Sequence, residues 1–311
     1  MFYEQTEFHK ELLQNFSIKG LIDKPLPRPL SGFIRVRRLD LFITFANQKP
    51  KKIMSILQTA ERSSHLDPSE NVIFQRHLIA YKEAAKLISG TVLEIGSGEG
   101  YGVSELAGKS EKYLAIDKYF SPISEDLMGK YNIEFKQMNV PPLRGIADNS
   151  MDFVVAFQVI EHIQDDELFI KEIYRVLKPG GKAVLTTPNI LMSLSRNPWH
   201  IREYTPSEMK NILQISFKNI DLKGVYGNEK VLNYYAENKK SVDKIRKWDI
   251  FNLEKNLPRW MVQMPYDILN RFNRHKLQNN NESLVDGIEF TDYSVKDVSD
   301  GCLDYFCIVT K

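Results

Sequence analysis

The first residues that could do chemistry are glycines in alternate positions: Gly96, Gly98, Gly100 and Gly102. They follow the apolar run 91–95, in which Glu94 is the one charged residue. Glycine lets the backbone turn sharply and approach a ligand closely, because it has no Cβ. Asp117 ends the next apolar run, 21 positions after the first glycine. Its carboxylate could accept both hydroxyls of a ribose, so this spacing predicts a nucleoside site.

Two histidines could act as general bases, because the pKa of imidazole lies near neutral pH. His162 follows Glu161 after the apolar run 151–158, on the side where parallel sheets bind ligands. His200 lies in the run N-P-W-H-I-R-E-Y-T-P at 197–206, whose polar and aromatic side chains suit a substrate pocket. A structural role is the alternative for His162, and helix capping or packing is the alternative for His200. We expect His200 to be the base, with His162 and Glu161 as the other candidate catalytic residues.

Short apolar runs alternate with segments of helical periodicity along the chain. The expected strands are 91–95, 112–116, 133–140, 151–158, 183–187, 217–225 and 302–310. The expected helices are 71–89, 121–130, one capped by Asp165 or Asp166, and 206–214. Such alternation without internal repeats predicts a parallel sheet with helices on both faces.

Four separated motifs indicate one family. They include the G-x-G-x-G loop with Glu94, Asp117 after the second strand, and the run R-V-L-K-P-G-G-K-A-V-L-T-T-P-N at 175–189. They resemble class I S-adenosylmethionine-dependent methyltransferases, in the type 11 and ubiquinone-biosynthesis-like subgroup. The dinucleotide fingerprint G-x-G-x-x-G is absent, because residue 101 is tyrosine. The resemblance implies an α/β fold with a Rossmann-like, seven-stranded, mostly parallel sheet, helices on both faces and an antiparallel last strand. It also implies S-adenosyl-L-methionine as the cofactor.

Residue by residue, the resemblance implies a role for each motif. The glycine loop would hold the methionine end of the cofactor, Asp117 its ribose, and the end of the third strand its adenine. Tyr81 would lie near the cofactor carboxylate, where Arg76 could replace the arginine that often occupies the place of Ala80. The cofactor-binding residues expected in this way are Tyr81, Glu94, Gly96, Ser97, Gly98, Gly100, Asp117, Lys118, Asn139, Val140 and Gln158.

A metal-dependent variant is the alternative for the segment after the fourth strand. Q-V-I-E-H at 158–162 is similar to the E-x-x-E-H run that binds a divalent ion in ubiquinone-pathway and small-RNA O-methyltransferases. Gln158 stands in the place of the first glutamate. A hard cation prefers anionic oxygen ligands, so the loss of one disfavours a metal site and we expect none.

The chain divides into three parts. Residues 1–70 form an N-terminal extension, 71–225 with 301–311 form the cofactor-binding domain, and 226–300 form a helical insertion before the last strand. An insertion of this length is too long for a structureless loop, so we expect a lid or a substrate subdomain.

The segment 258–276 of the insertion carries apolar side chains near helical spacing, among them Trp260 and Phe272, beside basic residues. A core face is one interpretation. Contact with an anionic membrane surface is another. Because Pro265 interrupts the segment, we expect two short helices that fold as a lid over a pocket.

The composition narrows the function classes. The net charge of +2, from 42 basic and 40 acidic residues, gives no reason to expect a nucleic-acid partner. Cys302 and Cys307 cannot build a disulfide framework or a cysteine zinc site, and packing is their expected role. No run approaches the roughly 18 apolar residues of a membrane span, and the N-terminus lacks a signal-peptide pattern. A cytoplasmic location is therefore expected.

Together the motifs predict a methyltransferase that O-methylates a small molecule or a glycan sugar, with His200 or His162 as base. The run P-N…N-P-W-H-I-R-E-Y-T is similar to methyltransferases of glycan and secondary metabolism, which favours this acceptor. One alternative is an RNA or protein methyltransferase with 1–70 as a docking module. The other is a cofactor-binding interaction protein without catalysis.

Overall fold

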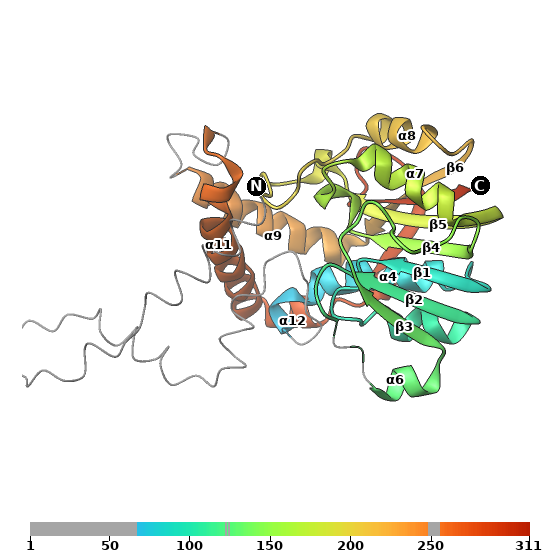
Figure 1. Ribbon diagram of the computed structural model, residues 1–311. Coiled ribbons are helices and arrows are strands. Elements are labelled where there is room, and N and C mark those ends of the chain that lie inside the picture. The colour runs from blue at the N-terminus through green and yellow to red at the C-terminus, as the bar shows by residue number, and fades with distance from the viewer. Residues whose placement is uncertain (1–66, 122, 124, 248–255) are drawn as a thin grey trace, which may run out of the picture. The chain divides into compact units, whose positions relative to one another are not determined.

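Eight strands form one sheet in the order β3-β2-β1-β4-β5-β8-β6-β7 (Figure 1). The computed structural model describes residues 67–247, apart from 122 and 124, and residues 256–311. The strands are β1 Thr91–Ile95, β2 Lys112–Asp117, β3 Ile133–Gln137, β4 Met151–Phe157, β5 Leu177–Pro188, β6 Asn219–Gly227, β7 Tyr293–Asp297 and β8 Asp304–Thr310. β1 to β5 are parallel, whereas β8 runs antiparallel to β5 and β6. The Rossmann-like, mostly parallel sheet with an antiparallel last strand is thus confirmed.

Two details of the sheet differ from the sequence prediction. It has eight strands rather than seven, because β7 forms within the expected insertion and pairs antiparallel with β6. Its sequence, Y-S-V-K-D, is short and pairs with one strand only, so no long apolar run marks it. β3 ends at Gln137 rather than at Val140. Pro141 and Pro142 follow closely, and proline cannot donate a ladder hydrogen bond.

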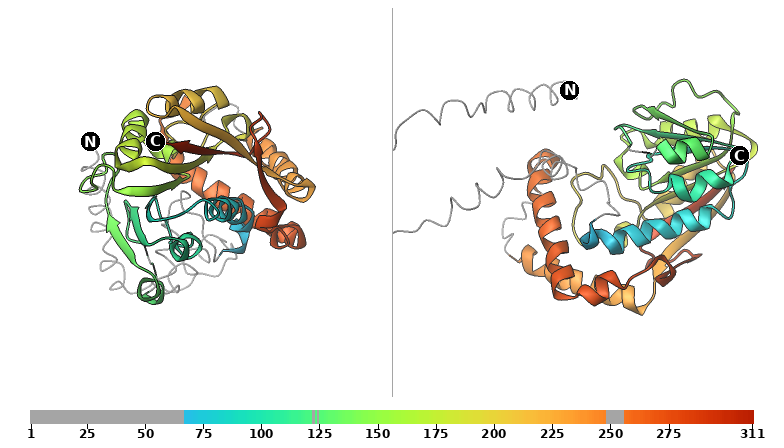
Figure 2. Two further views of the ribbon diagram at one scale, coloured as in Figure 1. Left: turned by 90° about the vertical axis from the view of Figure 1, so that its right-hand side faces the viewer. Right: turned by 90° about the horizontal axis from the view of Figure 1, so that it is seen from below.

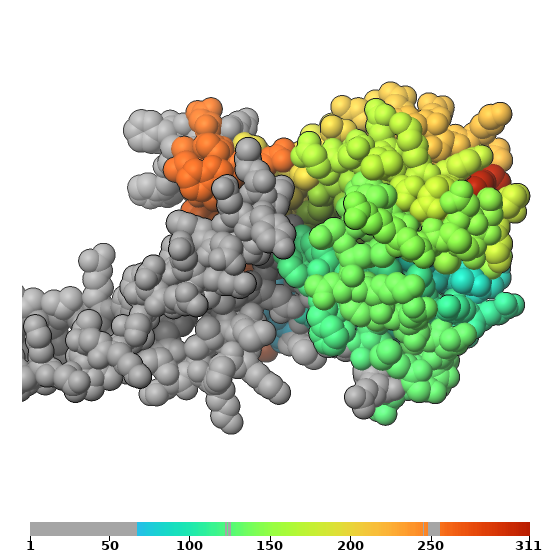
Figure 3. Space-filling model, in the orientation of Figure 1, coloured from blue at the N-terminus to red at the C-terminus, as the bar shows by residue number. Residues whose placement is uncertain are grey.

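Helices cover both faces of the sheet, as expected (Figure 2). They are α4 Asn71–Ala84, α5 Val103–Leu106, α6 Glu125–Lys130, α7 Asp166–Val176, α8 Pro206–Gln214, α9 Glu229–Arg246, α11 Arg259–Asn280 and α12 Glu282–Asp286. Short 3-10 helices are Pro68–Glu70, Ala107–Lys109, Ile160–His162, Ile190–Met192 and Phe290–Asp292. Side chains alternate along β1: Leu93 and Ile95 pack in the cluster that includes α7 and α8, and Val92 packs with α4, α5 and α9. In Figure 3, the green to yellow segment forms much of the visible face of the described domain.

Local capping explains where two helices of this segment begin. Oδ1 of Asp165 accepts a hydrogen bond from the Leu168 amide at 3.0 Å, which makes Asp165, not Asp166, the N-cap of α7. Thr205 and Glu208 form a reciprocal capping box at the start of α8. These caps fix the ends of the helices that flank the segment with His200.

The insertion differs from the expected pair of short helices. α11 is one helix of 22 residues that continues through Pro265. Proline removes one backbone hydrogen bond and costs about 3 kcal/mol in a helix interior, and the packing of α11 against α9, α12 and Pro68–Glu70 offsets that loss. Figures 1 and 2 show α11 beside α9.

The apolar stripe of α11 is not a core face. Its members are exposed: Trp260 66%, Met261 43%, Met264 72%, Ile268 62%, Leu269 45% and Phe272 64%. The buried residues of the same helix are Asn273 and Leu277. No described helix combines the length and the apolarity that a membrane span requires. Cys302 and Cys307 are buried free thiols, in agreement with a packing role.

Candidate active site

The loop after β1 adopts a conformation that requires glycine. Gly96, Gly98 and Gly100 have φ angles of +80°, +55° and +78°, a region that other residues rarely enter. A Cβ on Gly96 would lie 2.5 Å from Cγ2 of Val159. Gly102 has no positive φ angle, but a Cβ there would lie 2.0 Å from Cε1 of Tyr81. Each glycine is therefore explained by backbone conformation, by close packing or by both.

Asp117 ties the glycine loop to the end of β2. Its Oδ2 accepts a hydrogen bond from the Gly98 amide at 2.9 Å, and its Oδ1 accepts one from the Tyr119 amide at 2.8 Å. The amides of Gly96 and Ser97 donate to the Ile116 carbonyl at 2.8 and 3.1 Å. The carboxylate thus lies beside the glycine loop, as the register of the two motifs indicated.

A first cavity of about 220 Å³ lies at the carboxyl ends of β1, β2 and β4. Most of the residues expected to bind the cofactor line it: Tyr81, Gly96, Ser97, Gly98, Asp117, Lys118, Asn139, Val140 and Gln158. Glu94 and Gly100 do not line it. The sequence interpretation missed the other lining residues, among them His77, Tyr101, Tyr119 and Met138. Glu99 and Tyr101 lie inside the glycine loop, so their positions in the sequence carried an indication.

Glu94 lies beneath the loop rather than in the first cavity. Its two carboxylate oxygens accept hydrogen bonds from the hydroxyls of Tyr81 at 2.8 Å and Tyr113 at 2.9 Å. Burial raises the pKa of Glu94 to about 7, although both phenol hydrogen bonds oppose the rise. Glu94 therefore joins Tyr81 and Tyr113 through hydrogen bonds next to the glycine loop.

Arg76 does not serve the first cavity. Its Nε lies 3.0 Å from Oδ2 of Asp304 in a buried ion pair. His77, the next residue, is half-buried, and desolvation, with the charges of Arg76 and Arg274, lowers its pKa to about 3. Arg76, which we considered as a partner of the cofactor carboxylate, is thus paired with Asp304 at the start of β8.

A second cavity of about 220 Å³ adjoins the first, and the two share His77, Gln158 and His162 as lining residues. Its core side includes Glu161, Asn189, Asn197, His200 and Glu203, and its insertion side includes Tyr234, Tyr235, Asn238, Tyr266, Asn270 and Arg274. The insertion therefore contributes to a cavity, as a substrate subdomain would. It does so with polar and phenolic side chains, and none of the exposed apolar stripe of α11 takes part.

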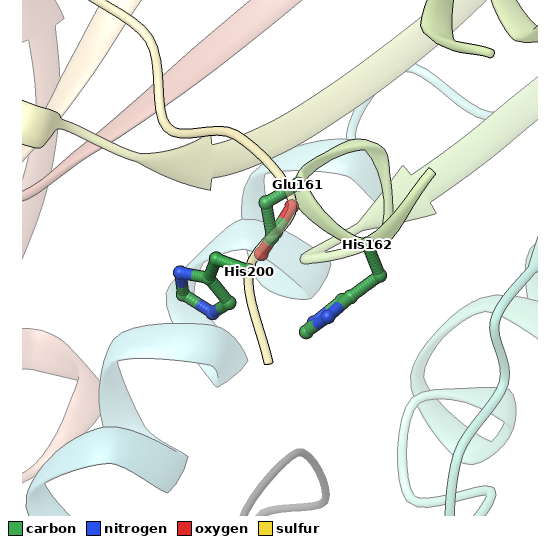
Figure 4. A group of neighbouring side chains, drawn as sticks. All are labelled: Glu161, His162 and His200. Atoms are coloured by element: carbon green, nitrogen blue, oxygen red, sulfur yellow. The ribbon is translucent and has the colours of Figure 1, made fainter. Parts of the chain in front are cut away.

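The three expected catalytic residues come together where the cavities meet. Glu161 and His162 lie in the 3-10 helix after β4, and His200 lies in the loop that precedes α8. One possible ligand atom from each lies within 4.8 Å of the others, and Figure 4 shows all three side chains. The backbone carbonyl of Glu161 accepts hydrogen bonds from the amides of Ile201 at 2.7 Å and Arg202 at 3.3 Å. These bonds hold the two segments together.

Each histidine of this group is oriented through its Nδ1 atom. Nδ1 of His200 lies 2.6 Å from Oε1 of Glu203, and Nδ1 of His162 lies 3.2 Å from the carbonyl oxygen of Trp199. Both partners accept hydrogen bonds, so both rings carry their proton on Nδ1 in the neutral form. The Nδ2 amide of Asn197 lies 2.8 Å from Nε2 of His200 and donates to it.

Glu161 is fully buried beside the two imidazoles. Its Oε2 accepts a hydrogen bond from the Thr187 hydroxyl at 3.0 Å, whereas Oε1 is buried without a hydrogen-bond partner in the described structure. Burial raises the pKa of Glu161 to about 7, against the opposing effects of His200 and of the Thr187 hydrogen bond. Gln158 lies in the same corner with a φ angle of +55°, a strained conformation of the kind that clusters at functional sites.

Comparison with known proteins agrees with this geometry. A family model described as a methyltransferase domain matches residues 93–185. A probable S-adenosylmethionine-dependent methyltransferase of Mycolicibacterium smegmatis is 36% identical over 176 residues, which cover 54% of this chain and 68% of that relative. Another, of Mycobacterium tuberculosis, is 35% identical over 176 residues and is covered to 64%.

Solved structures give a weaker likeness. Phosphoethanolamine N-methyltransferase 2 of Haemonchus contortus, solved with S-adenosyl-L-methionine, is 18% identical, with a TM-score of 0.45 over 77% of this chain and 56% of that one. The identity of 36% over 68% of the Mycolicibacterium relative shows the family of this chain. The chain belongs to the S-adenosylmethionine-dependent methyltransferases, and its cofactor is S-adenosylmethionine.

Proposed function

We propose that this enzyme transfers the methyl group of S-adenosylmethionine to a hydroxyl oxygen of a small molecule or a glycan sugar in the second cavity. The observation that carries the proposal is the grouping of Glu161, His162 and His200 where the two cavities meet. A donor methyl group held in the first cavity and an acceptor held in the second would meet at this group. Proton-accepting side chains are what a hydroxyl acceptor needs at that point.

The lining of the second cavity supports a hydroxyl-rich acceptor. Side-chain amides and phenols on the insertion side include Asn238, Asn270, Tyr235 and Tyr266. Amides both donate and accept hydrogen bonds, as sugar hydroxyls do, and tyrosine rings add apolar surface for the faces of a sugar ring. This lining supports a small molecule or a sugar unit over a folded protein or RNA.

The sulfonium already activates the methyl group, so the enzyme must align the acceptor and remove one proton. The hydroxyl oxygen attacks the methyl carbon, the bond from sulfur to that carbon breaks, and S-adenosylhomocysteine leaves. The acceptor hydroxyl takes the place of the Asn197 amide at Nε2 of His200, and its proton passes to that nitrogen. Glu203 supports this role, because the hydrogen bond at 2.6 Å keeps the other ring proton on Nδ1.

A screen with methyl-labelled cofactor tests the proposal. Purified full-length protein is incubated with pools of sugars and oligosaccharides, phenolic and aliphatic alcohols, total RNA and unrelated proteins. We expect label in an alcohol or sugar pool, recovered as a base-stable methyl ether, and no label after His200→Ala. His275→Ala, at an exposed histidine on α11, is the matched control and should keep activity. Label found only in RNA or protein would overturn the proposal.

A further inference from the structure

Arg76 and Arg274 line the second cavity, and the proposed function gives neither of them a role. Arg76 comes from α4 and Arg274 from α11. Their side chains are only 15% and 13% exposed. A guanidinium is always charged in proteins, and its N–H donors form a planar fork that matches a carboxylate or a phosphate. Two such groups in one cavity of about 220 Å³ favour an anionic ligand.

Each arginine is held by a carboxylate that does not line the cavity. Nε of Arg76 lies 3.0 Å from Oδ2 of Asp304, and Nη1 of Arg274 lies 3.1 Å from Oε1 of Glu70. Neither Asp304 nor Glu70 belongs to the lining. Since a guanidinium has five N–H donors, each of these contacts uses only part of the group. The ion pairs therefore position both arginines and leave donors for a ligand.

The remaining donors are accessible. Nη2 of each arginine makes no hydrogen bond to a described residue, and neither Nη2 atom is fully buried. Nη1 of Arg76 donates to the hydroxyl oxygen of Tyr235 at 3.0 Å. Tyr235 also lines the cavity, and its own O–H proton is still available to donate. The two guanidinium groups and this phenol thus form a set of donors suited to one anionic oxygen group.

The charges of the two arginines reach neighbouring cavity residues in spite of the ion pairs. Desolvation, with the charges of Arg76 and Arg274, lowers the pKa of His77 to about 3. Burial raises the pKa of Tyr234 to about 12, and the same two charges oppose that rise. This part of the cavity is therefore electropositive, which favours an anion over a cation.

The carboxylates of the lining belong to the group at which the hydroxyl would react. Glu203 is bonded to His200 at 2.6 Å, and Glu161 lies beside His200. The cavity therefore combines proton-accepting groups after β4 and β5 with cationic groups from α4 and α11.

We propose that the methyl acceptor carries an anionic oxygen group, a carboxylate or a phosphate, and that Arg76 and Arg274 bind it. This assignment rests on the proposed function and narrows the acceptor to a sugar acid, a hydroxy acid or a sugar phosphate. A neutral sugar would leave the donors unpaired, and a site built to hydrogen-bond a group discriminates strongly against an analogue that lacks it.

The carboxylate of the cofactor is another anion that could meet these arginines. The first cavity, which the proposed function assigns to the cofactor, is lined by neither Arg76 nor Arg274. This separation favours the acceptor as their ligand. The experiment therefore keeps the cofactor site filled.

Calorimetry on full-length protein saturated with S-adenosylhomocysteine tests the inference. The probes are glucuronate, glucose 6-phosphate and glucose, which share one sugar ring and differ in charge. We expect one of the two anionic probes to bind about 10-fold or more tightly than glucose, because hydrogen bonds to charged groups are the stronger ones. Preference for glucuronate identifies a carboxylate, and preference for glucose 6-phosphate identifies a phosphate. Arg274→Gln should remove the advantage over glucose.

Three further variants separate ligand binding from a structural role. Glu70→Gln breaks the ion pair of Arg274 but keeps the guanidinium, so it should keep the affinity for the anionic probe. Lys276→Gln removes a positive charge from an exposed position on the same helix, outside the cavity, and should bind unchanged. Arg76→Lys keeps a charge beside Asp304 but loses the planar fork, so it should weaken the anionic probe. Circular dichroism and thermal melting check that each variant is folded.

Equal affinity of the wild-type protein for the three probes would overturn the inference. So would a preference for anions that survives in both Arg274→Gln and Arg76→Lys, or a loss of S-adenosylhomocysteine affinity in these variants with an unchanged probe preference. The two proposals fail separately. In the labelled-methyl screen, label in neutral sugars alone refutes the anionic acceptor while O-methylation stands. An arginine-dependent preference for the small anions, with label only in RNA or protein, refutes the proposed function alone.

Discussion

Glu94 is expected to make the stability of the protein depend on pH. Its carboxyl is 1% exposed beneath the glycine loop, and burial raises its pKa from 4.5 to about 7. The folded state therefore binds this proton more tightly than the unfolded state does. The associated stability is fully present below about pH 4.5 and is lost as the pH rises toward 7. One pKa unit corresponds to 1.36 kcal/mol, so the loss amounts to about 3 kcal/mol.

The variant Glu94→Gln tests this reasoning, because a glutamine of the same shape does not titrate. Urea unfolding at pH 5, 6, 7 and 8 gives the difference in unfolding free energy between variant and wild type, from which all shared titrations cancel. We expect this difference to shift in favour of the variant by about 2.5 kcal/mol between pH 5 and 8, because part of the full loss already occurs below pH 5. Glu282→Gln, at an exposed glutamate, should show a constant difference. A constant difference for Glu94→Gln would refute the assigned pKa.

Three further predictions concern the two cavities. Asp117→Ala should weaken the binding of S-adenosylmethionine and of S-adenosylhomocysteine by about 2 to 3 kcal/mol, as measured by calorimetry, because hydrogen bonds to a charged acceptor contribute about that much. NAD should not compete with either compound. His200→Ala should abolish turnover in the labelled-methyl assay while calorimetry shows nearly unchanged cofactor affinity; full activity at saturating acceptor would contradict the role of His200. Asn270→Ala should raise the acceptor KM, whereas Trp260→Ala with Phe272→Ala should leave it unchanged, because those two side chains are 66% and 64% exposed and do not line the second cavity. Salt-sensitive sedimentation with anionic liposomes, lost in that double variant, would assign the stripe to a membrane surface.

The first cavity was predictable, because the residues that mark it lie close together in the sequence. The positive φ angles of Gly96, Gly98 and Gly100 leave glycine as the natural residue, so their spacing is visible in the chain. Asp117 follows one strand later, and adjacent parallel strands end at the same edge of the sheet. Glu94 shows the limit of such reading. The sequence placed Glu94 next to the glycine loop, but it did not show that Tyr81 from α4 and Tyr113 from β2 bind the buried carboxylate.

The second cavity was less predictable, because its contacts join segments that are far apart in sequence. Arg76 was a candidate for the cofactor carboxylate, and only the position of β8 shows that it pairs with Asp304. The apolar stripe of α11 had the periodicity of a core face, and periodicity alone cannot say which side of a helix meets the protein. Pro265 was expected to break the helix, but one missing hydrogen bond did not outweigh the tertiary packing.

This difference between the two cavities has a functional consequence. The first cavity is built largely from one stretch, from α4 to the end of β4. The second cavity draws on the loop with His200, on α9 and on α11, and these segments meet it through side chains such as Asn238 and Asn270. Under the proposed function, in which the second cavity holds the acceptor, substitutions on the insertion would alter which acceptor fits without disturbing the glycine loop or Asp117. The proposed function therefore predicts that variants of the insertion change the acceptor KM while the affinity for S-adenosylmethionine stays constant.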